Sequence, residues 1–202
     1  MRIKLSIQGA GMNDTNTPES YDKHFRTEPG RWAKPRETDY LVRDIINDRF
    51  GDKHISILDM GCGQGRTIKM IKTPNRTITG IDFSEEALKL ARKENPDCMF
   101  WHQNMTLPFI DFPNATYYDV ILSMGSHEHV KKINFVVPYD ILYNGGLFLC
   151  ILPCQKVSKG WGQIGPQHEW ELSREEWSRH LEGDGFKIEP EILHNWLFIC
   201  HK

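Results

Sequence analysis

Short runs of apolar residues recur through the middle of the chain, bounded by turn residues such as glycine, proline, asparagine and aspartate. Runs of this length predict five β-strands: Ile55–Met60, Thr77–Ile81, Cys98–His102, Tyr118–Ser123 and Leu147–Leu152. The segments between the first three strands have helical patterns, one from about Gln64 to Lys72 and one from a cap at Ser84 to the residues before Pro96. Strands that alternate with helices are typical of a parallel sheet covered by helices on both faces.

Two helices are predicted before this central region. The run Thr17-Pro18-Glu19 supplies a capping side chain, a proline at the first helical position and an acid in the first turn. It predicts a short helix over about Pro18–Phe25. A second helix is predicted over about Arg36–Phe50, because apolar residues recur there at helical spacing until Gly51 ends the pattern.

The last part of the chain has a different pattern. Ser173 and Glu176 form a capping box, which predicts a helix that ends at Gly183. Two apolar segments follow it and are predicted as closing strands, Phe186–Ile192 and Asn195–Cys200.

The composition narrows the class of protein. The 202 residues are 39% hydrophobic and 26% charged, which favours one compact domain and excludes a collagen, a coiled coil or a wholly disordered chain. The net charge of −2 gives no basic field for nucleic acid or anionic lipid. No apolar stretch approaches the roughly 20 residues that a membrane helix needs. The five cysteines are odd in number and lack close CxxC pairs, so reduced thiols and a cytoplasmic location are expected.

The most informative segment is Ile57–Gly65, which places three glycines between a buried strand and a helix. Glycine allows positive φ and lets a ligand approach the backbone, and the helix start offers N–H groups to an anion. A phosphate loop needs Lys and Ser/Thr after its last glycine, and the dinucleotide fingerprint needs a glycine where Arg66 stands. Neither pattern fits. What remains is an acid, Asp59, followed two residues later by Gly61-Cys62-Gly63.

A second acid follows the next predicted strand. Asp82 lies 21 residues after Gly61 and ends the run Thr77–Ile81. An acid at the end of the second strand of such a unit can accept two hydrogen bonds from a ribose diol. The alternative is that Asp82 only begins a turn, but its spacing from the glycine turn favours a binding role.

The glycine turn is followed in order by Gly80–Ser84, Tyr118–Ser123 and Gly145-Gly146. Together with Ile57–Gly65, these segments resemble the class I S-adenosylmethionine (SAM)-dependent methyltransferases of the small-molecule type, over about half of the chain. The resemblance implies SAM as cofactor and an α/β fold: a Rossmann-like, doubly wound, seven-stranded sheet that is mostly parallel with an antiparallel last strand.

The resemblance also implies how the chain is divided. Residues 1–17 are expected to be a flexible tail, and residues 18–202 a single methyltransferase domain. Within this domain we expect a helical cap at 18–50, a cofactor-binding core at 55–152 and an acceptor-side region at 153–202.

The resemblance assigns several residues to the cofactor. Asp59 and the run Gly61-Cys62-Gly63 would lie at its methionine end, and Asp82 at its ribose. Phe83 would lie against the adenine, where a flat apolar ring is useful, although ordinary packing could also explain it.

Other cofactor residues are expected after the third and fourth strands. The family usually has an acid facing the adenine amino group, and this chain has Asn104, whose amide oxygen could still accept from that group, followed by Met105. Ser123 and Met124 would lie near the transferable methyl group.

The N-terminal segment lies outside the well-matched core. Many relatives fold such a segment over the cofactor, with a Tyr or Arg near the methionine carboxylate, which suggests Tyr21 and Arg31. The structural alternative is that this aromatic helix face only packs in the core.

The acceptor is expected beyond the carboxyl ends of the strands, where the fourth strand delivers His127-Glu128-His129. A histidine titrates near neutrality, so His127 and His129 are candidate bases, although the Glu-His pair of relatives often only caps a helix. Some relatives use that pair with an earlier acid to hold a divalent metal, but Met124 stands at the earlier position, so no metal is expected.

His168 resembles the histidine that the family often places shortly before its late capped helix, and it is a third catalytic candidate. Trp161, in a glycine-rich loop, could belong to a lid or could pack at the surface.

The residues therefore favour an enzyme that moves a methyl group from SAM to a small soluble acceptor, with oxygen, nitrogen or sulfur all open as the acceptor atom. We expect no nucleic-acid or membrane partner, and a monomer or homodimer. Two other functions remain open: a SAM-binding regulatory or scaffold protein without turnover, and an NAD-dependent oxidoreductase, which Arg66 disfavours.

Overall fold

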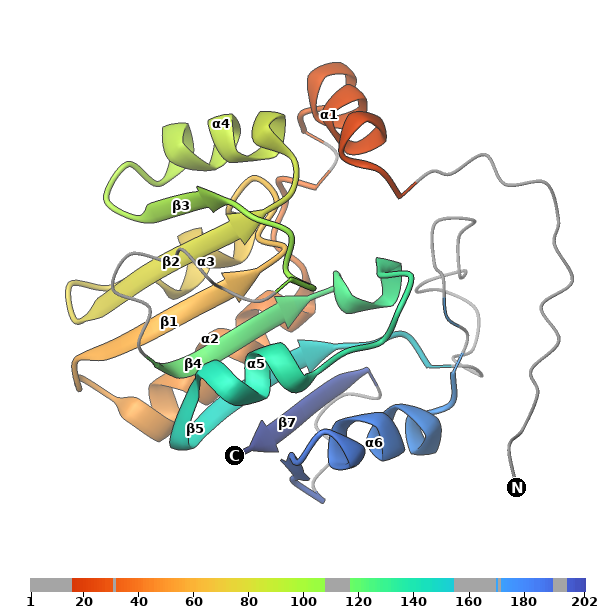
Figure 1. The fold of residues 1–202 in the computed structure, drawn as a ribbon. Coiled ribbons are helices and arrows are strands. Elements are labelled where there is room, and N and C mark those ends of the chain that lie inside the picture. The colour runs from red at the N-terminus through yellow and green to blue at the C-terminus, as the bar shows by residue number, and fades with distance from the viewer. Residues whose placement is uncertain (1–15, 31, 108–116, 155–169, 171, 191–195) are drawn as a thin grey trace, which may run out of the picture.

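The computed structural model describes residues 16–30, 32–107, 117–154, 170, 172–190 and 196–202. The described strands form a seven-stranded sheet in the order β3-β2-β1-β4-β5-β7-β6 (Figure 1). The strands are β1 (Ile55–Met60), β2 (Arg76–Asp82), β3 (Met99–His102), β4 (Tyr118–Met124), β5 (Leu142–Ile151), β6 (Lys187–Ile188) and β7 (Leu197–His201).

The sheet is parallel from β3 to β5 and antiparallel at its other end. β1 pairs in parallel with both β2 and β4, while β7 runs antiparallel between β5 and β6. This arrangement confirms the predicted Rossmann-like, mostly parallel sheet. Because the chain leaves β1 toward β2 and β3 and returns on the other side as β4, the strand order reverses at β1. Ligands bind at the carboxyl ends of the strands around such a point.

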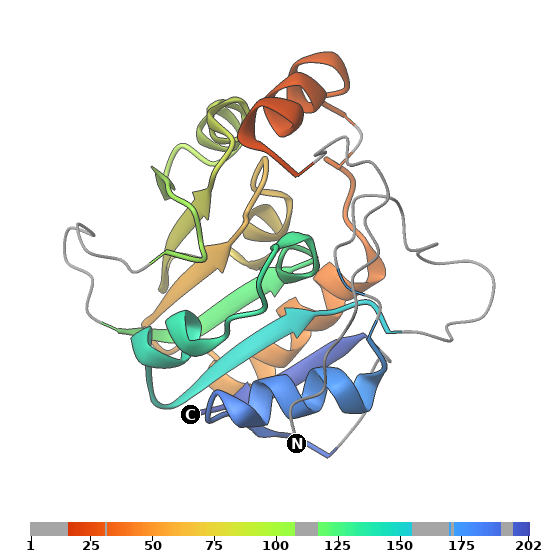
Figure 2. The same ribbon diagram turned by 45° about the vertical axis from the view of Figure 1, so that its right-hand side comes forward.

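Helices cover both faces of the sheet. The described helices are α1 (Pro18–Thr27), α2 (Glu37–Phe50), α3 (Arg66–Ile71), α4 (Glu85–Glu94), the single 3₁₀ turn η1 (His127–His129), α5 (Val136–Ile141) and α6 (Arg174–Gly183). In Figures 1 and 2, α2 and α3 lie behind the sheet and α5 and α6 lie in front of it. α1 packs on α4, beside the carboxyl ends of the strands (Figure 1). Among the described residues, none of the helices combines the length and the apolar character that crossing a bilayer requires.

The predicted caps begin these helices. Thr17 accepts a hydrogen bond from the Ser20 N–H at the start of α1, and Ser84 accepts one from the Ala87 N–H at the start of α4. Ser173 and Glu176 form the capping box of α6, as predicted. Each cap satisfies N–H groups that a helix start leaves without an intrahelical partner.

The structure differs from the predicted elements in several places. β5 begins at Leu142, because the register shifts between Tyr118 and Val120 of β4 and the chain around Gly145 is accommodated before regular pairing resumes at Leu147. α5 was not predicted, since it is short and carries Pro138, which its first turn tolerates. Within the described residues, the predicted closing strand Phe186–Ile192 is only β6 (Lys187–Ile188), and the predicted strand Asn195–Cys200 is β7 (Leu197–His201). Residues 191–195, and residues 1–15 of the predicted tail at 1–17, lie outside the described residues.

The core is continuous across the central strands. Every residue of β1 is buried except the half-buried Ser56, and the largest fully buried side chains include Trp177, Phe135, Phe148 and Phe198. Trp177 of α6 donates its indole N–H to the Pro153 carbonyl over 2.9 Å, so this large ring is buried without an unsatisfied donor. The central strands are therefore held rigidly, which fixes the positions of the side chains at their ends.

Candidate functional site

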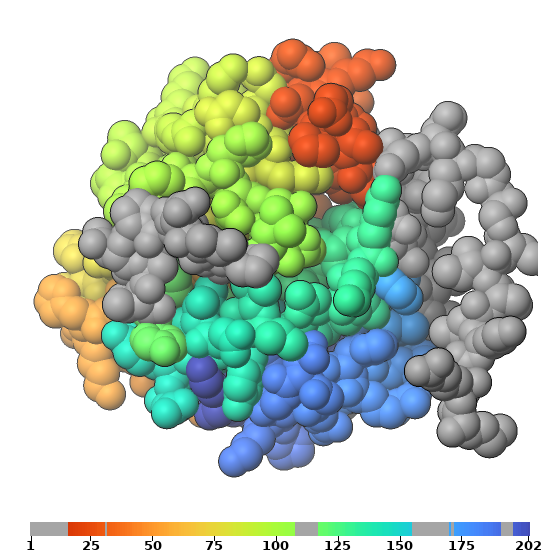
Figure 3. Space-filling model, viewed as in Figure 1, coloured from red at the N-terminus to blue at the C-terminus, as the bar shows by residue number. Residues whose placement is uncertain are grey.

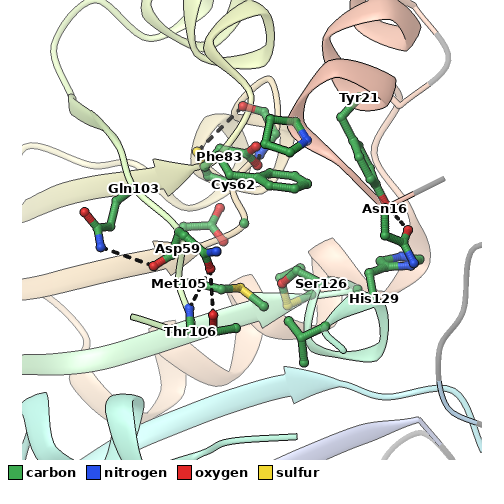
Figure 4. Close-up of a pocket in the computed structure, with 18 of the residues that line it drawn as sticks. Asn16, Tyr21, Asp59, Cys62, Phe83, Gln103, Met105, Thr106, Ser126 and His129 are labelled. Carbon is green, nitrogen blue, oxygen red and sulfur yellow. Dashed lines mark hydrogen bonds between the residues drawn. The ribbon is translucent and has the colours of Figure 1, made fainter. Parts of the chain in front are cut away.

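A cavity of about 1000 Å³ opens at the carboxyl ends of β1, β2 and β4. The residues that follow these strands line it, together with residues of α1 and the segment after β3. Figure 3 shows the surface hollowed between α1 (red), the residues after β3 (green) and η1 (teal). Figure 4 shows the side chains that face the cavity. This is the place where the strand order predicts a ligand.

The glycine turn borders the cavity. Gly61, Gly63 and Gly65 all have positive φ, at 71°, 55° and 77°, a conformation that favours glycine. The Gly61 and Cys62 N–H groups donate to the Ile81 carbonyl over 2.8 and 2.9 Å, which ties the turn to β2. The turn is therefore rigid before any ligand binds.

The glycines differ in what they face. A Cβ at Gly61 would lie 2.5 Å from the Cβ of Ser126, so this glycine is needed for close packing against the residue after β4. At Gly63 the nearest such atom is Cζ of Phe25, 3.6 Å away. Gly61 and Gly63 both line the cavity, and a methyl group at Gly63 would meet only the Phe25 ring at van der Waals distance.

Asp82 joins the turn to the next connection. Its Oδ2 accepts from the Gly63 N–H over 2.8 Å, and its Oδ1 accepts from the Ser84 N–H over 2.9 Å. Burial raises the pKa of Asp82 to about 6, while these N–H groups and His102 act in the opposite direction. A carboxylate has about four lone-pair positions, so Asp82 keeps acceptor capacity for further donors.

An aromatic wall closes the cavity beside Asp82. The ring of Phe83 lies 5.1 Å from that of Tyr21, and Tyr21 lies 6.1 Å from Trp32, measured between centroids. Asp22 of α1 fixes this wall, because its Oδ1 accepts from the Ser84 hydroxyl over 2.5 Å and from the Glu86 N–H over 3.2 Å. The cavity thus has an apolar, aromatic face suited to a flat ring.

Charged side chains lie at the other end of the glycine turn. Asp59 is buried, and its Oδ1 has no hydrogen-bond partner among the residues that the structure describes. Burial raises the pKa of Asp59 to about 7, against the neighbouring Arg66 guanidinium, which lowers it. Arg66 itself pairs with Asp39 at 2.8 Å, between Nε and Oδ2.

Arg36 lines the same end of the cavity and was missed by the sequence analysis. Burial and the nearby Arg66 lower the pKa of Arg36, while the carboxylates of Asp39 and Glu128 act in the opposite direction. Its only signal in the sequence is its place just before α2, whose start reaches the cavity. A half-buried guanidinium of this kind is suited to an anionic group.

His127 does not line the cavity. It is buried, stacks on Phe135 with centroids 4.9 Å apart, and its Nδ1 lies 2.6 Å from the Ser123 hydroxyl. Ser123 in turn lies 2.9 Å from the Ser126 hydroxyl, which donates to the Met60 carbonyl over 2.8 Å.

The donors and acceptors along this series of hydrogen bonds can be assigned in only one way. The Ser126 hydroxyl donates its proton to the Met60 carbonyl, so the Ser123 hydroxyl must donate to the Ser126 oxygen. The Nδ1–H group of His127 must then donate to the Ser123 oxygen. Burial lowers the pKa of His127 to about 3. His127 is therefore a neutral structural donor, and we do not retain His127 as a base or Ser123 as a residue that faces the methyl group.

This burial predicts a pH effect on stability. The unfolded imidazole takes up a proton below its ordinary pKa of about 6.5, whereas the folded one does not until about 3. The contribution of this group to the free energy of unfolding therefore decreases as the pH is lowered below 6.5, by at most about 1.4 kcal/mol per pH unit. His127→Gln should reduce the loss of stability between pH 7 and pH 5 by up to about 2 kcal/mol in urea unfolding. An identical pH dependence in the two proteins would contradict a neutral, buried His127.

Glu128 and His129 lie on η1 and both line the cavity. Glu128 is buried, and its Oε1 lies 3.8 Å from His129 Nε2. The ring of His129 lies 6.3 Å from that of Tyr21, so both predicted residues face the same end of the cavity (Figure 4).

Three further predicted residues line the cavity, Asn104, Met105 and Met124. The amide oxygen of Asn104 accepts from both the N–H and the hydroxyl of Thr106, over 3.0 and 2.8 Å (Figure 4). Its two lone pairs are thus in use, and the expectation that it receives an adenine amino group finds no support here.

Some predicted residues lie outside the described part of the chain, namely Arg31, Trp161 and His168. Several lining residues had not been singled out from the sequence, among them Arg36, Gln103 and Ser126, and Glu128 had been noted only as part of the Glu-His pair. Among the described residues, no group of three His, Cys, Asp or Glu side chains is arranged to hold a metal ion.

Comparison with known proteins identifies the domain. Residues 57–138 match the sequence model of a methyltransferase domain. A probable S-adenosylmethionine-dependent methyltransferase of Mycolicibacterium smegmatis is 29% identical over 176 residues, which are 83% of this chain and 65% of that protein. A ubiquinone biosynthesis O-methyltransferase of Actinobacillus pleuropneumoniae is 32% identical over 116 residues, 54% of this chain and 48% of that protein. The chain thus spans about half to two thirds of the length of these relatives.

Solved structures agree on the fold. A SAM-dependent methyltransferase from Aquifex aeolicus superposes with a TM-score of 0.62 at 18% identity, over 92% of this chain and 97% of that one. The domain match and the sheet order together show that residues 57–138 carry a methyltransferase domain, within a chain that has the fold of the SAM-dependent methyltransferases.

Proposed function

We propose that this protein transfers a methyl group from SAM to a hydroxyl oxygen of a small-molecule acceptor. The observation that carries the proposal is the Asp82 carboxylate, which is bonded to the glycine turn at Gly63 and borders a large cavity at the strand ends. A volume of about 1000 Å³ is at the upper end of the range for small-molecule sites, so it leaves room for an acceptor beside the cofactor.

The cofactor is proposed to lie along the glycine turn. Its ribose hydroxyls would donate to Asp82, and its adenine would lie against Phe83. The amino-acid end would meet the two opposite charges at the far end of the turn: the unpartnered Oδ1 of Asp59 suits the ammonium group, and the guanidinium of Arg36 suits the carboxylate. Arg36 would thereby take the part that the sequence suggested for Arg31, and Tyr21 lines the same cavity.

In this reaction the main role of the protein is to align the acceptor atom with the methyl group. The sulfonium group of SAM is already an activated leaving group, so the acceptor atom must only be held in line with the methyl carbon and the sulfur, and lose its proton where it has one. The segment Met124–Ser126 at the end of β4 lies next to the glycine turn and would face the methyl group.

Oxygen is proposed as the acceptor atom on the likeness to relatives that are named O-methyltransferases. A small molecule is preferred over nucleic acid because the net charge is −2.

Two measurements test this function. In calorimetric titrations the protein should bind S-adenosylhomocysteine, the product of methyl transfer, and should not bind NADH. With methyl-labelled SAM and a metabolite extract, label should pass to an acceptor. Preference for NADH would favour the oxidoreductase, and tight SAM binding without any transferred label would favour a binding protein without turnover.

A further inference from the structure

Asp39 joins the two helices behind the sheet, α2 and α3 (Figure 2). It belongs to α2, and its side chain is fully buried. Its Oδ1 accepts from the Thr67 hydroxyl over 2.8 Å and from Arg66 Nη2 over 3.2 Å. Its Oδ2 accepts from the Arg36 N–H over 2.7 Å and lies 2.8 Å from Arg66 Nε. A carboxylate has about four lone-pair positions, so this one has no capacity left for a further donor.

The partners of Asp39 line the cavity, namely Arg36, Arg66 and Thr67. Asp39 itself is not among the described residues that line it. With no free lone pair and no place on the cavity wall, Asp39 cannot bind a ligand directly. Its effect is to hold three lining residues, which come from two different helices, in fixed positions.

Arg66 lies close to a second carboxylate, that of Asp59, because its positive charge lowers the pKa of Asp59. It nevertheless contacts both oxygens of Asp39, whereas Asp59 has no ion-pair partner among the described residues and its Oδ1 has no hydrogen-bond partner there. The Thr67 hydroxyl and the Arg36 N–H already fix the Asp39 carboxylate. The planar guanidinium therefore meets two oxygens that are ordered in advance, which favours Asp39 over Asp59.

The ion pair of Asp39 and Arg66 contributes little to holding the helices together. The cost of removing both charges from water offsets much of their attraction, and apolar side chains of similar size often serve as well. The Arg66 side chain is 10% exposed and lies on the cavity wall. The main effect of the pair is therefore on the cavity.

We propose that Asp39 is a positioning residue for the cofactor: it engages Arg66 so that the guanidinium does not close on Asp59, and it fixes the Arg36 backbone at the cavity. The inference rests on the SAM binding proposed above, in which Asp59 meets the ammonium group and Arg36 the carboxylate. Without the charge of Asp39, Arg66 would pair with Asp59, and the ammonium group would lose its partner.

The test compares two ligands by isothermal titration calorimetry at pH 7.5. S-adenosylhomocysteine carries the amino-acid end, and 5′-methylthioadenosine has the same adenosine and sulfur without the ammonium and carboxylate groups. For Asp39→Asn, the Kd of S-adenosylhomocysteine should rise at least about tenfold, while that of 5′-methylthioadenosine changes less than about threefold. Asp44→Asn is the matched control, because it makes the same change on the same helix at an exposed carboxylate that pairs with Arg43. It should leave both affinities unchanged.

The pH dependence gives a second readout, which a general loss of packing would not move. The charged groups around Asp59 are Arg66 of α3, Asp39 of α2 and Asp82 of β2, and the Cys62 thiol lies beside it. Burial raises the pKa of Asp59 to about 7, with Asp39 and Asp82 acting in the same direction and Arg66 against it. In the wild type, the ratio of S-adenosylhomocysteine affinity to 5′-methylthioadenosine affinity should rise as the pH passes this value. In Asp39→Asn the rise should lie at lower pH, because a charge that raises the pKa is gone and Arg66 is free to approach.

Arg66→Lys decides the question if Asp39→Asn does not fold. Lysine keeps the positive charge but lacks the fork that contacts both oxygens of Asp39, so the same selective loss of S-adenosylhomocysteine affinity is expected. Equal losses for the two ligands, or unchanged affinity for S-adenosylhomocysteine, would show that Asp39 does not position the cofactor. A selective loss with an unmoved pH rise would contradict the route through Asp59. A wild-type protein that does not bind S-adenosylhomocysteine overturns the proposed function instead.

Discussion

Gly61→Ala should lower the free energy of unfolding by roughly 2–4 kcal/mol. Two costs add at this position. Its φ of 71° is strained for any residue with a Cβ, and the new Cβ would lie 2.5 Å from Ser126 Cβ and 2.8 Å from its hydroxyl oxygen. Ser126 cannot move freely, because it donates to the Met60 carbonyl and contacts Ser123. Urea unfolding at pH 7 measures the change.

Two further variants separate the costs. Gly183→Ala is the control, since nothing lies within 4 Å of the added methyl group and its φ is not positive, so its stability should match or slightly exceed that of the wild type. Adding Ser126→Gly to Gly61→Ala should recover the part of the loss that comes from overlap, in a double-mutant cycle. If Gly61→Ala is as stable as Gly183→Ala, the close approach of the turn to Ser126 does not exist.

Asp82→Ala should weaken the binding of S-adenosylhomocysteine by about 1–3 kcal/mol, or roughly 5- to 150-fold in Kd. The variant loses the carboxylate that we propose as the acceptor for the ribose hydroxyls. It also releases the N–H groups of Gly63 and Ser84, which Asp82 holds at 2.8 and 2.9 Å. Isothermal titration calorimetry gives the affinity directly.

Asp97→Ala is the matched control for Asp82→Ala, because Asp97 is an exposed carboxylate whose partner is Lys72 on the surface. It should leave the affinity unchanged. Equal affinity of Asp82→Ala and the wild type would remove Asp82 from the cofactor site.

Much of the fold could be predicted because its signals are local. The strand Ile55–Met60 is bounded as its apolar run predicts, and the caps at Thr17, Ser84 and Ser173 begin helices at the expected residues. The glycine turn could also be located, since positive φ restricts the residue type at three positions so close together. These features depend on a few neighbours along the chain.

The features that could not be predicted depend on residues far apart in the sequence. His127 appeared to be a candidate base because it follows a strand, but Phe135 and Ser123 bury it and use its proton. Arg36 gave no such signal, because its surroundings depend on burial and on the charge of Arg66, which lies 30 residues further along the chain. The sequence places residues at the strand ends, whereas packing decides which of them face the ligand.

Asn104 illustrates the same limit at short range. It follows β3 and lines the cavity, yet its amide oxygen accepts hydrogen bonds from Thr106, two residues later. Asparagine often bonds to its own backbone two residues on, and this local turn competes with any ligand for the oxygen.

The tie between α1 and α4 has a consequence for shortened forms of the protein. Asp22 occupies the Ser84 hydroxyl and the Glu86 N–H, directly beside the residue pair Asp82 and Phe83. A chain trimmed to begin after Thr27 would lose Tyr21 from the aromatic wall of the cavity and also Asp22, the carboxylate that braces the first turn of α4. Trimming this segment to aid crystallisation would therefore remove part of the proposed binding site for the ribose and adenine along with the helix.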